Sequence, residues 1–144
     1  MKAIAMHIDE LLRRYQSGER NFKGANLIGG YLYGVNLSGA NLQGASLSEV
    51  DLSEANLTGV NLREASLVRA NLTGANLTQA NLNGANLFEA KLTGATLQEA
   101  HLKMADLIDA DFTAANLEKA NLYGAYLTGT LLQGAIMPDG TIYQ

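Results

Sequence analysis

Large apolar residues recur at every fifth position over most of this sequence, from Phe22 to Met137. Of these 24 positions, 21 are Leu, and Ala precedes the large residue by two places in 18 cases. Asn lies between the two in 12 cases, and Gly follows the large residue by two places in 12 cases. The unit therefore reads Ala-Asn-Leu-x-x over residues 20–139. A repeat this regular indicates a solenoid, in which each unit stacks on its neighbours.

A period of five excludes a uniform helix and a straight strand. On an α-helix five residues advance by about 140°, so the leucines would spread around every side. On a straight strand, successive leucines would point to opposite faces because five is odd. The chain must therefore turn a corner once per pentad. The Gly position fits the turn residue that needs a positive φ, and we expect a different turn type where Gly is replaced, as at Glu49, Glu54, Arg69 and Glu89.

Tandem Ala-Asn-Leu-x-x units resemble the pentapeptide repeat family. The segment from Leu12 to Phe22, which contains Tyr-x-x-Gly-Glu-Arg-x-Phe, is similar to the start of small cyanobacterial members. The resemblance implies an all-β solenoid, a right-handed quadrilateral β-helix with four pentads in each coil. The 24 pentads then predict about six coils.

The two ends of a solenoid expose core and need caps. Residues 8–17 are predicted to form a short helix, because Ile8, Leu11, Leu12 and Tyr15 share one face. We divide the chain into an N-terminal capping helix in residues 1–19, the β-helix in residues 20–139 and a tail in residues 140–144. Tyr31 and Tyr33 in the first coil are expected to pack beneath the helix.

Stacking in the family's register sorts the outward side chains into columns. The column that contains His101 is otherwise Asn and predicts a ladder of amide hydrogen bonds along the rod, with a structural role for His101. The side chains of a second column are expected to point into solvent, although most of them are apolar. We interpret the apolar members as a candidate partner face: Ile28, Val68, Phe88 and Ile108. A third group either packs under residues 141–143 or forms a C-terminal dimer interface, as in some members of the family that the chain resembles: Tyr123, Tyr126, Leu131 and Ile136.

The sequence carries little chemistry. It has no Cys, and His7 and His101 are its two histidines, which excludes a cysteine nucleophile and a three-histidine zinc site. No phosphate-binding loop or nucleophile motif has the required spacing, so we expect no enzyme activity, no catalytic residues, no cofactor and no metal. A net charge of −4 argues against direct nucleic-acid binding. We expect no membrane span and no signal peptide, and hence a cytoplasmic protein.

These observations predict a non-catalytic protein–protein interaction module or structural scaffold with an unidentified protein partner, and a homodimer through the C-terminal end as a further option. The resemblance also implies an alternative, because some members of the family mimic DNA and inhibit or protect DNA gyrase. Residues 20–139 hold 11 acidic and 7 basic residues. The acidic residues spread over several faces, and Arg69 and Lys91 interrupt their columns. The sequence therefore favours the scaffold.

Overall fold

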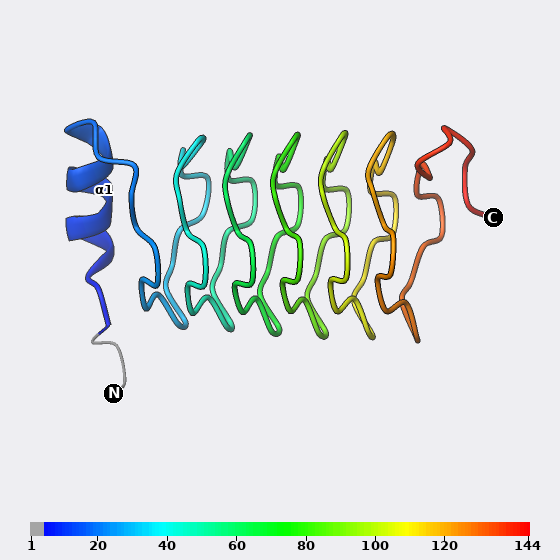
Figure 1. Ribbon diagram of the computed structural model, residues 1–144, viewed down its shortest axis with the longest axis horizontal. Coiled ribbons are helices and arrows are strands. Elements are labelled where there is room, and N and C mark those ends of the chain that lie inside the picture. The colour runs from blue at the N-terminus through cyan, green and yellow to red at the C-terminus, as the bar shows by residue number, and fades with distance from the viewer. Residues whose placement is uncertain (1–4) are drawn as a thin grey trace.

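The computed structural model describes residues 5–144 as a rod of stacked coils with one helix across its N-terminal end (Figure 1). This helix, α1, spans Ile8–Gln16 and is the one element in these residues that is longer than a single β-bridge. Each later pentad contributes a bridge residue, a core residue and a two-residue turn. The amide after the turn donates to the core carbonyl, as from Ala75 to Leu72 at 3.0 Å. The chain therefore turns a corner in every pentad, as the period predicts.

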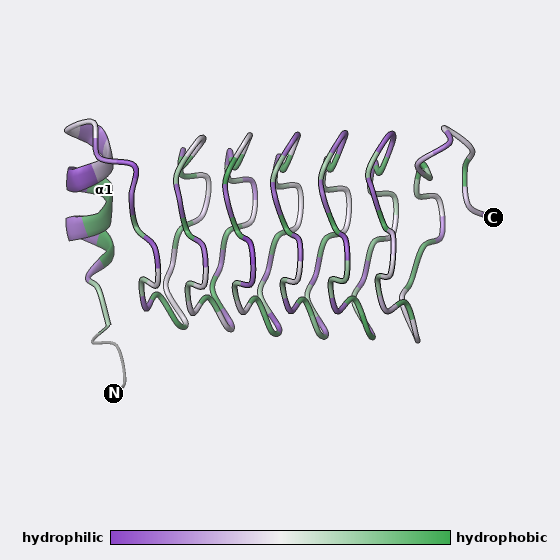
Figure 2. Cartoon of the chain, viewed as in Figure 1, coloured by the Kyte–Doolittle hydropathy of each residue, from purple (hydrophilic) through white to green (hydrophobic). Residues whose placement is uncertain are grey.

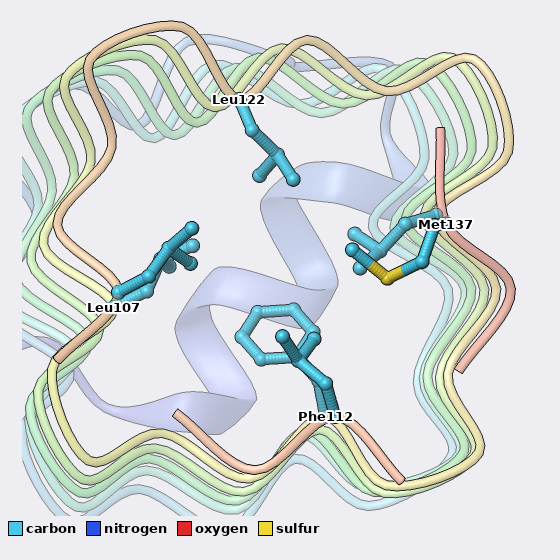
Figure 3. A pocket seen from close by; sticks show the side chains of 7 residues that line it. Leu107, Phe112, Leu122 and Met137 are labelled. Carbon is cyan, nitrogen blue, oxygen red and sulfur yellow. The ribbon is translucent and has the colours of Figure 1, made fainter. Parts of the chain in front are cut away.

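Neighbouring coils are joined as parallel strands with a register of 20 residues. The bridges run from Asn21–Asn41 to Asn116–Ile136. Adjacent coils exchange hydrogen bonds in both directions: the Asn41 amide donates to the Arg20 carbonyl at 2.7 Å, and the Phe22 amide donates to the Asn41 carbonyl at 2.8 Å. Four pentads therefore make one coil, and a view along the rod shows its square outline (Figure 3). Residues 20–39 are called the first coil, and residues 120–139 the last coil.

The core is a column of leucines lined by alanines. In the middle of the rod, residues such as Leu72 and Ala75 have no exposed surface, and no polar residue in the described part of the chain is buried. Each fully buried Leu side chain contributes about 2 kcal/mol by leaving water. The apolar column thus drives the coils together, while the backbone hydrogen bonds fix their register.

The turn residue after each core position keeps one conformation whether or not it is Gly. Gly94 has φ +67°, and Glu49, Glu54, Arg69 and Glu89 have φ between +56° and +59°. The hydrogen bond that closes the turn is also kept, as from Val50 to Leu47 at 3.2 Å. The expectation of a different turn type at these residues is therefore wrong. Stacking on both neighbouring coils fixes the backbone, and the side chains accept a left-handed conformation that costs about 1–2 kcal/mol.

The Asn residues before the core positions have a local role that differs from the predicted ladder. The Asn61 side-chain oxygen accepts a hydrogen bond from the Arg63 amide at 3.0 Å, and Asn76 and Thr78 repeat this contact at the same distance. Within residues 5–144, one amide pair of the predicted ladder column is bonded, from Asn41 to Asn21 at 3.4 Å. Asn and Asp are therefore favoured because their side chains bond the backbone two residues on.

His101 lacks an oxygen for this contact, and the coil before it supplies one. The Asn83 side-chain oxygen accepts from the Lys103 amide at 2.9 Å, across one coil. His101 itself is exposed on the outer surface of the rod. Its place in the column is therefore tolerated because a neighbouring residue replaces the missing hydrogen-bond acceptor.

The helix α1 lies with its apolar side against the first coil, and its polar side faces away (Figure 2). Leu11 has no exposed surface and belongs to the core, while Ile8 and Leu12 pack against it. The Tyr15 hydroxyl donates to the Ser38 carbonyl at 2.7 Å. Residues 1–4 of the expected capping segment lie outside the described residues. No helix among residues 5–144 has the length and apolar character needed to cross a membrane.

Candidate functional site

The C-terminal end of the rod leaves the apolar core open. In a view into this end, Leu107, Phe112, Leu122 and Met137 point from the four sides toward the centre, with α1 visible at the far end (Figure 3). The cavity between these side chains measures about 10 Å³, enough for roughly one water molecule. Leu127, which occupies a core position in the last coil, is 41% exposed. The end is therefore an exposed apolar surface filled by its own side chains rather than a ligand cavity.

Three of the four sides of the last coil also have open strand edges. In the preceding coil, the Leu102 and Leu107 amides donate to carbonyls of the last coil at 2.8 and 2.9 Å. The corresponding amides of Leu122, Leu127 and Leu132 have no protein acceptor within residues 5–144. Unpaired donors around an apolar surface are the features that pair an edge strand with another chain.

The fourth side of the last coil is closed by the tail. Ile142 pairs with Ile136 in an antiparallel bridge, the Gly134 amide donates to the Tyr143 carbonyl at 2.9 Å, and the Tyr143 amide donates to the Ala135 carbonyl at 2.8 Å. This edge of the rod thus accepts an antiparallel strand, although the coils themselves pair in parallel.

The four residues predicted for the C-terminal end have two different environments. Ile136 is half-buried beneath the tail, whereas Tyr123, Tyr126 and Leu131 remain exposed. The tail therefore accounts for one of the four. Sequence reasoning missed the core residues themselves, above all Leu127. The position of Leu127 in the last coil was the available signal, because a core residue with no coil after it lacks the contacts that bury the core residues of inner coils.

The predicted partner face is less exposed than its sequence suggests. Ile28 in the first coil is 58% exposed, but Val68, Phe88 and Ile108 are half-buried. These three lie in successive coils of the stack, so each has a coil on either side. The column therefore forms a continuous apolar stripe with a modest exposed area.

The column beside the stripe carries paired charges. The Arg69 guanidinium lies 3.4 Å from a Glu49 carboxylate oxygen and 3.8 Å from a Glu89 carboxylate oxygen, one coil away on each side. All three side chains are about half exposed, so these pairs contribute little to stability. Lys91 lines the same shallow depression in the outer surface. The surface next to the stripe is therefore mixed in charge.

Two exposed tyrosines lie on the first coil. Tyr31 and Tyr33 are 71% and 55% exposed, and their rings are stacked with centroids 6.4 Å apart. The expectation that they pack beneath the helix is wrong, because both flank Leu32 on the outer surface while α1 covers the end of the core.

The titratable groups of the described chain do not converge on a site. No group of three or more His, Asp or Glu side chains in residues 5–144 could hold a metal ion. Two carboxyls of the coils and the tail have a lowered pKa: the Thr113 hydroxyl and amide donate to Asp111, and the Thr141 hydroxyl and amide donate to Asp139. Both are local turn contacts, so the perturbed groups belong to the architecture of the rod.

Solved structures that are similar to this chain include the following three. A pentapeptide repeat protein from the thylakoid lumen of Arabidopsis thaliana is 32% identical, with 70% of each chain covered and a TM-score of 0.69. The pentapeptide repeat protein Rfr23 from the cyanobacterium Cyanothece 51142 is 28% identical over 96% of this chain and 100% of that chain, with a TM-score of 0.71. The fluoroquinolone resistance protein QnrB1 is 22% identical over 80% of this chain and 58% of that chain, with a TM-score of 0.75, and shows likeness of fold alone.

A search of curated proteins gave no match. The family model described as pentapeptide repeats matches residues 21–59, 55–94 and 90–129, which together cover most of the chain. The solved relatives imply a right-handed β-helix solenoid. The chain belongs to the pentapeptide repeat family.

Proposed function

We propose that this chain is a non-catalytic interaction rod of about six coils, capped at one end by α1, that pairs with a second copy through its open C-terminal end. The observation that carries the proposal is the combination of incompletely buried core leucines, with Leu127 41% exposed, and unpaired strand edges in the last coil. Both features favour burial against another polypeptide, because exposed core and free backbone donors are costly to leave unmatched.

The geometry of two facing coils supports a second copy as the occupant. When two identical ends face each other, their coils wind in opposite senses, so abutting strands run antiparallel. The Ile136–Ile142 bridge supports this arrangement, since the same edge already pairs with an antiparallel strand. Such a contact uses the same surface on both copies and closes after two.

The size of the end supports a stable but not permanent pair. A side of five residues measures about 16 Å, and a side-chain layer of about 5 Å on each edge gives a square of about 26 Å. Each copy then buries about 650 Å², and the pair about 1,300 Å². This total lies at the low end of specific interfaces, so we expect a dimer that dissociates on dilution.

The charge pattern does not favour the alternative of DNA mimicry. A DNA mimic needs rows of acidic side chains where phosphates would lie. On this rod Arg69 lies between Glu49 and Glu89, and Lys91 follows Asn71 in the column that begins with Tyr31 and Asp51. Gyrase binding is therefore an alternative for experiment rather than part of the proposal.

Sedimentation equilibrium of the 144-residue chain tests the proposal. The wild type is expected to shift from 15.3 kDa toward twice that mass as concentration rises. Leu127→Glu places a charge in the apolar end and should leave a monomer at every concentration. Gln133→Glu adds the same charge on the outer side of the last coil and should still dimerise. A wild type that stays monomeric, or a Leu127→Glu variant that still dimerises, contradicts the proposal.

A further inference from the structure

The two ends of the rod differ in what covers them. At the C-terminal end, three strand edges are unpaired, and the core leucines of the last coil are incompletely buried. At the N-terminal end, α1 lies across the core, with Leu11 fully buried and Arg14 stacked 5.2 Å from the centre of the Phe22 ring. The rod therefore has one open end and one covered end.

The backbone beneath α1 has the acceptors that the open end lacks. In inner coils, the Asn41 and Asp51 carbonyls accept from the Phe22 and Leu32 amides of the preceding coil at 2.8 and 2.7 Å. The corresponding first-coil carbonyls are those of Asn21 and Tyr31, and within residues 5–144 neither has a backbone donor.

The last coil of one copy could therefore stack on the first coil of another in the register used inside the rod, with this first coil displacing the tail from the fourth side of the last coil. Its Leu122 and Leu132 amides would donate to the Asn21 and Tyr31 carbonyls of the next copy. Such a contact is parallel and joins two different surfaces, so it does not close after two copies.

In the structure, α1 and residues 5–7 occupy this surface. The Met6 amide donates to the Asn26 carbonyl at 2.9 Å, which fills one side of the first coil. The side chain of Ile8 lies against Gly30, where an added methyl would come within 2.9 Å of it. A second rod cannot reach the core of the first coil while these residues are in place.

We propose that α1 is a guard against head-to-tail polymerisation: the first-coil surface beneath it is a latent docking site for the C-terminal coil of a second copy. The inference rests on the proposed function, since it requires an adhesive C-terminal end. With α1 in place the rods stop at tail-to-tail pairs, and with α1 released they grow into linear chains.

The attachments of α1 are few enough to remove by substitution. Leu11 supplies its one fully buried side chain. The polar attachments include the Tyr15–Ser38 hydrogen bond and a hydrogen bond from the Arg20 guanidinium to the Tyr15 carbonyl at 2.8 Å. Arg14 also pairs with Glu19, which raises the pKa of Arg14 and lowers that of Glu19. The Arg20 guanidinium also lies 3.7 Å from the centre of the Tyr15 ring.

The test compares Leu11→Asp with Arg13→Asp, which places the same residue on the exposed side of α1. Hydrogen exchange measures the release of α1 and the protection of the coils, and sedimentation velocity measures assembly. Leu11→Asp should expose α1 amides, keep the coils protected and form concentration-dependent species larger than a dimer. Arg13→Asp should match the wild type.

Two further variants keep the test decisive. If Leu11→Asp disturbs the coils, Leu11→Ala releases α1 partially, and growth should follow the released fraction. Leu11→Asp combined with Leu127→Glu should lose the large species, because chain growth needs the C-terminal end. Released α1 with no species beyond those of the wild type overturns the inference. A monomeric wild type whose Leu11→Asp variant still forms chains would instead contradict the tail-to-tail pair and retain the guard.

Discussion

Ala114 and Ala115 give a matched test of how the rod tolerates side chains at its corners. Ala114 has φ +59° and an exposed methyl group, whereas Ala115 is the inward residue that follows it and has no exposed surface. Replacing each by Gly removes the same methyl group from neighbouring positions. The two variants therefore separate backbone strain from core burial.

The expected effects have opposite signs. At Ala114, Gly relieves a left-handed conformation that costs an L-residue about 1–2 kcal/mol, and it adds about 0.5–1 kcal/mol of backbone entropy cost. The net result is a stabilisation of about 0.5–1 kcal/mol. At Ala115, the same entropy cost adds to the loss of a buried methyl worth about 0.8 kcal/mol, which gives a destabilisation of about 1.5 kcal/mol.

Urea denaturation followed by circular dichroism measures both variants against the wild type. The midpoint should rise for Ala114→Gly and fall for Ala115→Gly, with an unchanged slope in each case. If Ala114→Gly lowers stability as much as Ala115→Gly does, the turn residue carries no strain and the reasoning is refuted.

The remaining predictions concern a turn carboxylate and the lateral stripe. Hydrogen bonds from Thr113 lower the pKa of Asp111, so its contribution to stability is present above the ordinary carboxyl pKa and is lost as pH falls through the lowered value. Asp111→Asn keeps an acceptor for the Thr113 amide and should weaken this pH dependence. Asp111→Ala removes the acceptor and should lower the free energy of unfolding by about 1 kcal/mol at neutral pH. Equal denaturation curves for the two variants at neutral pH would contradict the role of the acceptor. Phe88→Glu tests the stripe of Ile28, Val68, Phe88 and Ile108. A protein captured from lysate by the wild type should be lost from this variant and retained by Gln98→Glu, a control on another side of the rod. Equal capture by the wild type and Phe88→Glu contradicts a partner at this stripe.

The sequence predicts the inside of this rod better than its outside. A period of five with one large apolar residue per unit requires a chain that turns at every pentad and points that residue inward. Leu72 and Ala75 are buried in the core, as this pattern predicts. The φ of Glu49 could not be predicted from local preference, because the coils on either side impose it. The half-burial of Val68 and Phe88 likewise depends on their neighbours one coil away.

The repeat pattern predicts the two ends of the rod least well, because each end lacks one of the neighbouring coils that determine burial inside the rod. The pattern of apolar residues indicates a helix near residue 8, but Tyr31 and Tyr33 are exposed because they flank Leu32 on the outer surface, while α1 covers the end of the core. Leu127 carries the same residue type as the buried core and differs only in lacking a coil above it. Its exposure follows from its place in the stack.

Spin labels give the most direct measurement of how two copies meet. The chain has no Cys, so Gln133→Cys in the last coil and Lys23→Cys in the first coil each carry one label. In a tail-to-tail pair, residue 133 of one copy should lie within about 30 Å of residue 133 of the other, because the facing ends measure about 26 Å across. Labels at residue 23 should be about 50 Å apart, since about eleven coil spacings of 4.8 Å separate them. Short distances at residue 23, or no coupling at residue 133 where the chain is dimeric, would contradict pairing through the C-terminal end.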